Sequence, residues 1–163
     1  MLPLRSGATQ MDIQILRKVP LFSNLNSEQL KKIASICAER KVAAGQFIFR
    51  DEEPGDEMYV IVEGRVRISK AVPGIGEEAL AILEPGSYFG EMALIEESPR
   101  SADARAHISV TLSVIKKEAL DELMFVDKDL AYELLWTFVR TLSARLRETN
   151  EKIKAFFALS KFG

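Results

Sequence analysis

The spacing of apolar residues changes twice along the chain and divides it into three regions. Up to about residue 40, apolar residues recur at roughly helical spacing, which predicts short helices interrupted at Pro20. Ser27 begins a capping box, with Gln29 and Leu30 just beyond it, and is therefore the expected N-cap of one of these helices. We therefore assign residues 1–40 to an N-terminal helical segment.

Residues 41–115 form the second region, in which apolar and polar positions alternate, as in 47–49 and 108–114. His107 is interpreted as part of the last of these strands. Turn-forming residues separate the runs, at Gly45, Pro54, Gly55, Gly64, Pro73, Gly74, Pro85 and Gly86. Short strands bounded by Gly or Pro predict an all-β barrel or sandwich of about eight strands. With the flanking helices, the expected fold class is α+β, mainly β.

The third region, residues 116–163, contains no Gly or Pro between Lys116 and Phe157 and is expected to be helical, with a break near 125–129. Seven of its residues are spaced 4, 3, 4, 3, 4 and 3 apart: Leu135, Val139, Leu142, Leu146, Thr149, Ile153 and Phe156. Val139, Leu146 and Ile153 fall at the a positions of this heptad pattern, and the other four residues fall at d. β-branched residues at a, here Val139 and Ile153, with Leu at d favour a parallel two-stranded coiled coil. We therefore expect a homodimer through this helix. The alternative is a helix packed on its own barrel, which usually has a wider apolar stripe.

Composition and charge exclude several classes of protein. The 163 residues carry 22 Lys and Arg against 24 Asp and Glu, and a formal net charge of −2 argues against DNA binding. No apolar run approaches the ~20 residues that span a membrane, and no leader is visible, so a cytoplasmic protein is expected. One cysteine, Cys37, and one histidine exclude an internal disulfide and make a metal site or metal cofactor unexpected.

The segment 86–106 is the most informative for function. It is interpreted as a strand end, a glycine turn, a short helix and a return strand. Gly90 permits close approach of a ligand to the backbone. A helix starting at Glu91 would direct the N–H groups of Met92 and Ala93 towards a common point, where an anion could bind.

Two further side chains of this segment suit a phosphate. Arg100 supplies a permanent, fork-shaped cation, and Ser101 supplies a hydroxyl beside it. When it is ionised, the Glu91 carboxylate accepts hydrogen bonds but cannot donate one. It therefore suits a hydroxyl group of the ligand rather than the anion. A ligand with a phosphate and a neighbouring ribose hydroxyl accounts for both charges. The alternative is an Arg100–Glu91 salt bridge that merely holds the loop together.

The stretch Phe89-Gly90-Glu91-Met92-Ala93-Leu94, followed by Pro99-Arg100-Ser101-Ala102, resembles the phosphate-binding cassette of cyclic nucleotide-binding domains. The resemblance covers about residues 19–157 and includes the glycine spacing upstream. It implies a jelly-roll barrel, or double-stranded β-helix. It also implies that Glu91 accepts the ribose 2′-hydroxyl, and that Arg100 and Ser101 bind the cyclic phosphate. The other implied contacts are Gly90, Met92, Ala93 and Ala102 in the cassette, and Ile68 and Leu80 as apolar lining.

Asp103 departs from this family pattern, because many members carry Thr or an apolar residue there. An acidic side chain at this position could pair with Arg105 or Lys116, or it could weaken phosphate binding.

The last helix is similar to the dimer helix of catabolite-activator-type regulators, in which a Thr-Ser pair lies against adenine. Thr149 and Asn150 occupy these two positions, and Arg145 could reach Glu91 or the phosphate. Thr149 is also the one polar residue of the heptad pattern, so the alternative is a role in helix register alone. The resemblance implies cyclic AMP as the preferred ligand. Cyclic GMP stays open, because Ser101 and Asn150 could also bond guanine.

The expected function is a regulatory sensor that transmits nucleotide occupancy by repositioning its C-terminal helix. Because the sequence ends at Gly163, a helix-turn-helix domain is not expected and the effector would be a separate protein. Three alternatives remain: a dimerisation module with a non-functional or differently specific pocket, the sensor part of a longer transcription regulator, and an enzyme. An enzyme is not expected, since no Ser/His/Asp, Cys/His or metal constellation is visible.

Overall fold

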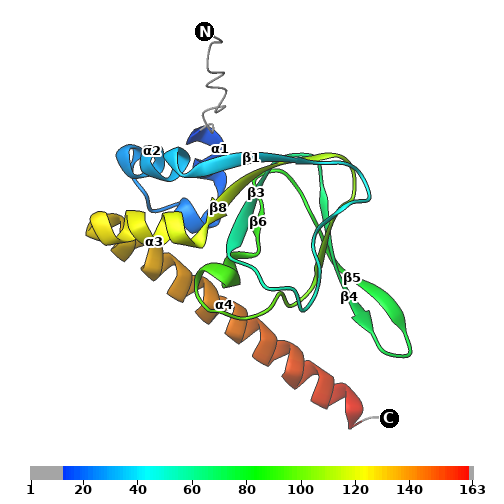
Figure 1. Cartoon of the computed structure of the whole chain (residues 1–163). Helices are drawn as coiled ribbons and strands as arrows, with labels where there is room; N and C mark the ends of the chain where they lie inside the picture. The colour runs from blue at the N-terminus through cyan, green and yellow to red at the C-terminus, as the bar shows by residue number, and fades with distance from the viewer. Residues whose placement is uncertain (1–12, 162–163) are drawn as a thin grey trace.

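The computed structural model describes residues 13–161 and confirms the expected mainly β fold with helices at both ends (Figure 1). The helical elements are α1 (Ile13–Lys18), η1 (Pro20–Phe22), α2 (Ser27–Ser35), η2 (Glu91–Leu94), α3 (Lys117–Val126) and α4 (Lys128–Ser160). The strands are β1 (Cys37–Val42), β2 (Phe47–Phe49), β3 (Glu57–Glu63), β4 (Val66–Val72), β5 (Gly76–Leu83), β6 (Tyr88–Phe89), β7 (Asp103–Ala106) and β8 (Val110–Lys116).

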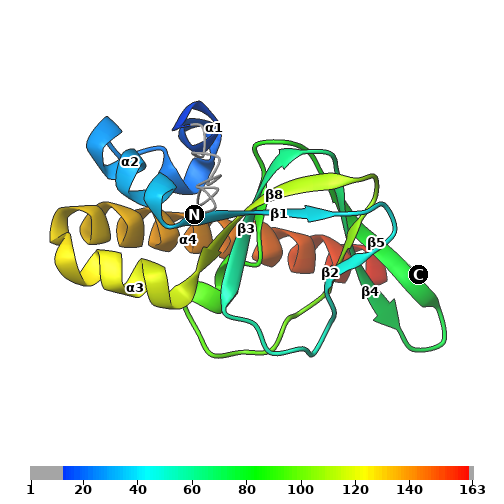
Figure 2. The same ribbon diagram turned by 45° about the horizontal axis from the view of Figure 1, so that its top comes forward.

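The strands form two four-stranded antiparallel sheets, in the orders β1-β8-β3-β6 and β2-β7-β4-β5. This confirms the barrel or sandwich that the turn spacing predicted, in the jelly-roll form that the resemblance implied. The β4–β5 hairpin extends away from the rest of the barrel in both views (Figures 1 and 2). Helices α1, α2, α3 and the start of α4 gather at the opposite end, and α4 continues from there past the barrel towards the side of the hairpin (Figures 1 and 2).

Strand β3 is buried on both faces and joins the two parts of the core. Met58 and Val60 face the core that the helices share with the barrel, whereas Tyr59 and Ile61 face the space between the sheets. Because both faces are covered, the strand has a continuous apolar run instead of an alternating one.

Helix α2 begins one residue earlier than the sequence suggested, with Asn26 as its N-cap. Asn26 Oδ1 accepts the Gln29 N–H (2.9 Å), and Gln29 Oε1 accepts the Asn26 N–H (2.9 Å). The expected capping box is therefore present, but Ser27 is its first helical residue rather than its cap. Asparagine is as good a cap as serine, so the residue types alone did not distinguish the two.

Two boundaries of the strand region differ from the prediction. Strand β1 begins at Cys37, inside the segment expected to be helical up to residue 40. It is an edge strand paired only with β8, and its middle residues are exposed and charged, so it has no alternating apolar pattern. His107 lies in the exposed connection after β7, where its N–H donates to the Arg65 carbonyl (2.9 Å), and is therefore not a strand residue.

The predicted break between the last two helices is confirmed at Asp127. Its Oδ2 accepts a hydrogen bond from Lys32 Nζ (2.6 Å), and its Oδ1 accepts the Leu130 N–H (3.0 Å) as the N-cap of α4. The hydrogen bond from Lys32 lowers the pKa of the Asp127 carboxyl most, and the hydrogen bond from the Leu130 N–H lowers it further. The carboxylate therefore both starts α4 and ties it to α2.

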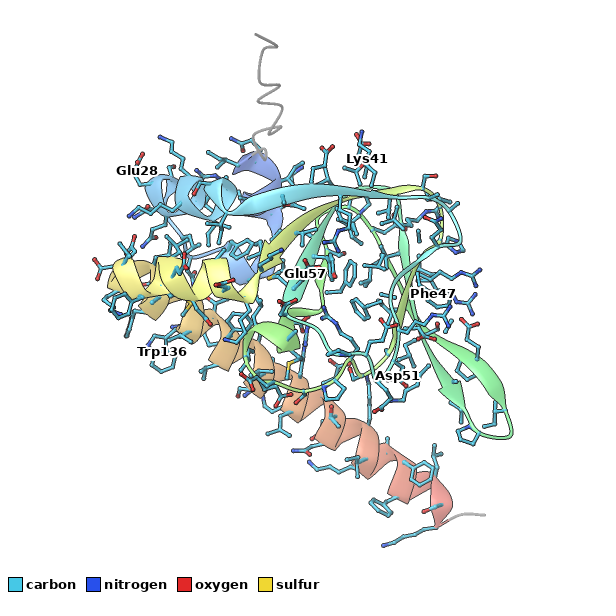
Figure 3. The ribbon with its side chains drawn as sticks, in the orientation of Figure 1. Glu28, Lys41, Phe47, Asp51, Glu57 and Trp136 are labelled. Atoms are coloured by element: carbon cyan, nitrogen blue, oxygen red, sulfur yellow. The ribbon has the colours of Figure 1, made fainter. Side chains whose placement is uncertain are left out.

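Helix α4 uses one face for the core of this chain and leaves another face uncovered. Leu130, Leu134 and Phe138 are buried in the helical core. The heptad residues point elsewhere: Leu135 (53%), Val139 (54%), Leu146 (62%), Ile153 (48%) and Phe156 (70%) are exposed, as is Thr149, and Leu142 is half-buried. Trp136 also lies on the side of α4 away from the strands (Figure 3). The alternative in which the heptad residues pack on their own barrel is therefore wrong.

Candidate functional site

A cavity of ≈ 400 Å³ lies between the barrel, the segment 90–102 and α4, and its volume suits a small-molecule ligand. Nine of the twelve predicted site residues line it: Ile68, Gly90, Glu91, Met92, Ala93, Arg100, Ser101, Ala102 and Arg145. The structure therefore brings together residues from β4, the segment after β6 and α4. Figure 1 shows α4 passing this end of the barrel.

Gly90 is required by the backbone at the start of η2. Its φ is 74°, and a Cβ there would lie 2.8 Å from Arg100 Nη1. The turn that follows is a short 3-10 helix, in which the Ala93 N–H donates to the Gly90 carbonyl (3.3 Å). The expectation that the Ala93 N–H is free for an anion is therefore wrong, because the tighter turn uses it.

Arg100 is the principal cation of the cavity, and it is only 7% exposed. Its Nη2 donates to the Glu57 carbonyl (2.9 Å) and its Nη1 donates to the Gly90 carbonyl (3.2 Å). Its guanidinium carbon lies 4.2 Å from the centroid of the Phe49 ring. Two carbonyls and an aromatic face therefore fix the position of the guanidinium plane.

Within residues 13–161, Arg100 forms no ion pair, and its Nε is buried without a hydrogen-bond partner. The predicted alternative, an Arg100–Glu91 salt bridge, is absent from the same residues, because Glu91 bonds Arg145. A buried charge without a counter-ion is costly unless a ligand supplies one. The site is therefore suited to an anion that enters the cavity.

Glu91 connects the cassette to the last helix. The residue is 8% exposed, and its Oε1 accepts a hydrogen bond from Arg145 Nη1 of α4. Burial alone would lower the pKa of Arg145, but the hydrogen bond and the charge of Glu91 raise it. The ion pair thus joins residues 54 positions apart in the sequence.

A second network supports the carbonyl that Arg100 uses. Arg40 donates from Nη1 and Nη2 to the two carboxylate oxygens of Glu57 (2.9 and 3.0 Å), and the Tyr59 hydroxyl donates to Glu57 Oε2 (2.9 Å). Burial, together with this bond, raises the pKa of Tyr59 to about 12, so the hydroxyl keeps its proton near neutral pH. Burial would raise the pKa of Glu57, but the bonds from Arg40 and Tyr59 lower it. Strand β3 is therefore held where its Glu57 carbonyl meets Arg100.

Three predicted site residues lie outside the cavity lining. Leu80 is 60% exposed because the β4–β5 register shifts at this point: Ile68 pairs with Ala81 and Ser69 with Ala79, which leaves Leu80 in a bulge. The expectation that Leu80 lines the pocket of this chain is therefore wrong. Thr149 and Asn150 are exposed on α4, beyond the cavity.

Sequence reasoning missed the aromatic wall of the site. Phe49 and Phe89 line the cavity, with their ring centroids 5.9 Å apart. The alternation of Phe47 and Phe49 could have identified Phe49 as the inward residue, since Phe47 is exposed. The role of the Glu57 carbonyl as an acceptor for Arg100 could not be predicted from the sequence, because every residue has a backbone carbonyl.

Two kinds of feature are absent from the described part of the chain. No group of three or more His, Cys, Asp or Glu residues is arranged to hold a metal ion. No helix between residues 13 and 161 is long and apolar enough to span a membrane.

Comparison with known families and proteins gives a consistent result. A family model described as "Cyclic nucleotide-binding domain" matches residues 39–127. The CRP-like cAMP-activated global transcriptional regulator of Mycobacterium tuberculosis is 26% identical over 140 residues, which cover 86% of this chain and 61% of that protein. The cGMP-dependent protein kinase, isozyme 1, of Drosophila melanogaster is 43% identical over 93 residues, which cover 56% of this chain and 12% of the kinase.

Among solved structures, the catabolite activator protein of Thermus thermophilus superposes with a TM-score of 0.76 at 30% sequence identity. The match covers 84% of this chain and 62% of that one. The chain thus spans less than two thirds of the length of each of these three proteins.

Proposed function

The chain belongs to the cyclic nucleotide-binding domain family, and from this premise we propose that it is a regulatory sensor that binds a cyclic nucleotide, with cyclic AMP preferred over cyclic GMP. The ligand would occupy the cavity between the cassette and α4. No catalytic step on the ligand is part of the proposal.

The observation that carries this proposal is the buried, carboxylate-free guanidinium of Arg100. It lies in the cavity lining with its Nε unpartnered, while two backbone carbonyls hold its other nitrogens. A cyclic phosphate would provide the missing counter-charge and accept from the guanidinium, and the Ser101 hydroxyl beside it would add a bond.

The remaining cassette residues suit the sugar. Glu91 would accept the ribose 2′-hydroxyl, and the backbone of Gly90, Met92 and Ala93 would surround the ribose and phosphate. Ile68 and Ala102 would provide apolar contact. Since Glu91 already bonds Arg145, the 2′-hydroxyl would join or displace that bond, which couples the ligand to α4.

Preference for cyclic AMP is supported by Thr149 and Asn150 on α4. In a homodimer through the heptad residues, one of these side chains from each copy would lie against the base. Cyclic GMP is the competing ligand, because Ser101 and Asn150 can also bond guanine. Relatives named for either nucleotide occur in the family.

Calorimetric titration of the purified chain with cyclic AMP and with cyclic GMP tests the proposal. We expect saturable binding of both, with the lower Kd for cyclic AMP. A lower Kd for cyclic GMP would overturn the preference. Absence of binding by either nucleotide would overturn the sensor function and favour a dimerisation module with a non-functional pocket.

We further propose that nucleotide binding repositions α4, because Arg145 joins the cavity to that helix. A ligand that binds one position of the helix better shifts the population towards it. Hydrogen exchange in residues 140–157 should therefore change when the nucleotide is added. Unchanged protection at saturating ligand would contradict transmission through this helix.

The proposed partners are a second copy of the chain and a separate effector protein. Direct DNA binding by these residues is not part of the proposal, since the formal net charge is −2. A cytoplasmic location is included, because a single half-buried cysteine needs no oxidising compartment.

A further inference from the structure

The loop between β2 and β3 is tied to the backbone on both sides of the Arg100 side chain. The Glu52 N–H donates to the Arg100 carbonyl (2.9 Å), and the Arg100 N–H donates to the Glu53 carbonyl (2.8 Å). The same loop touches the guanidinium, because a Cβ on Gly55 would lie 2.2 Å from Arg100 Nε. The position of the loop therefore determines the position of the cation.

Asp103 fixes this loop at its other end. Its Oδ1 accepts the Asp51 N–H at 2.8 Å. Neither of the pairings considered from the sequence, with Arg105 or with Lys116, is among the ion pairs of residues 13–161. The carboxylate thus acts as the acceptor that joins the loop to the start of β7.

Lys70 completes the arrangement from β4. Its ammonium lies 3.0 Å from the Ser101 carbonyl oxygen, to which it donates, and 3.5 Å from Asp51 Oδ2. Figure 3 shows Asp51 near the base of the β4–β5 hairpin, where these elements meet. We call Asp51, Lys70 and Asp103 the bracket. None of the three lines the cavity, so they reach a ligand only through Arg100 and Ser101.

We propose that Asp103 is a positioning residue, which holds Arg100 and Ser101 in place for the phosphate through the bracket. The inference rests on the proposed function, and it opposes the alternative, left open by the sequence, in which the acid at this position weakens phosphate binding. A negative charge alone would repel the phosphate, but a fixed guanidinium loses less entropy on binding and keeps its geometry.

The variants Asp103→Asn and Asp103→Ala separate position from charge. Both remove the charge, but only asparagine keeps the Oδ1 that accepts the Asp51 N–H. Glu97→Ala is the matched control, because it removes an exposed acid of the same segment that lies outside the cavity lining. If charge repulsion dominated, Asp103→Asn and Asp103→Ala would both bind cyclic AMP more tightly than the wild type.

The first readout needs no nucleotide. Amide hydrogen exchange in residues 50–56 and 99–103 should be at least tenfold faster in Asp103→Ala than in the wild type, and within about threefold of it in Asp103→Asn and Glu97→Ala. Equal protection in all four proteins would overturn the positioning role, whether or not the chain binds a nucleotide.

The second readout is affinity for cyclic AMP, measured below the thermal transition of every variant. Asp103→Ala should bind at least tenfold more weakly, whereas Asp103→Asn and Glu97→Ala stay within about threefold of the wild type. In an Arg100→Lys background, Asp103→Ala should have little further effect, since the two changes act through one contact. Additive losses would overturn the proposal. Faster exchange without any binding by the wild type would instead reject the proposed function alone.

Discussion

Replacing Arg100 with lysine should weaken cyclic AMP binding by a factor of 100 or more, equivalent to about 2.7 kcal/mol. Lysine keeps the positive charge, but it lacks the planar fork with which Arg100 bonds the Glu57 and Gly90 carbonyls from the lining of the cavity. Losing one partner of a buried, hydrogen-bonded charge pair costs about 2–5 kcal/mol. Calorimetric titration of the variant measures the effect.

Arg105→Lys is the matched control, because it makes the same chemical change on an exposed side chain of β7. Arg105 bonds the Gly45 carbonyl through Nε (2.5 Å) and does not line the cavity. Its variant should keep its affinity within about threefold of the wild type. Thermal unfolding of both variants establishes that each is folded at the titration temperature. Wild-type affinity in folded Arg100→Lys would show that this guanidinium does not bind the phosphate.

Replacing Leu146 with glutamate should convert a dimer into a monomer, with the dimer dissociation constant raised at least 100-fold. Leu146 is an a position of the heptad pattern, where the two copies of a parallel coiled coil meet. Two glutamates would then face each other in a desolvated interface, and like charges there are strongly unfavourable. Because the side chain is 62% exposed in the single chain, the barrel itself should fold normally. Sedimentation equilibrium measures the dissociation constant directly.

Ala144→Glu adds the same charge two residues away, at an exposed position outside the heptad pattern. This variant should remain as dimeric as the wild type. If Ala144→Glu and Leu146→Glu dissociated equally, the interface would involve another face of α4. A wild-type protein that sediments as a monomer at the highest concentration measured would reject the dimer itself.

Much of the barrel could be predicted because its signals are local. Gly and Pro mark the turns, and the apolar run of β3 survives because both of its faces are buried. Strand β1 escaped prediction because an exposed edge strand needs no apolar alternation, and its charged residues resemble a helix surface. The end of β7 before His107 depends on a backbone bond to Arg65, which has no side-chain signature.

The candidate site was predictable where function constrains side-chain type. Gly90, Glu91 and Arg100 are recognisable because each supplies something that few residues can supply. Leu80 was misassigned because a one-residue bulge in β5 cannot be inferred from an apolar pattern. The carbonyls of Glu57 and Gly90, which accept hydrogen bonds from Arg100, could not be predicted for a different reason. Which backbone carbonyl meets a given donor depends on the fold rather than on residue identity.

The Glu91–Arg145 ion pair has a consequence for how the molecule must respond to its partners. It joins the cavity to α4, the helix whose exposed heptad residues are proposed to join two copies. Linkage between two binding equilibria is reciprocal, so any factor by which the nucleotide strengthens dimerisation is also the factor by which dimerisation strengthens nucleotide binding. The apparent affinity for the nucleotide would then depend on protein concentration. An effector protein that binds α4 would change this affinity without contacting the nucleotide.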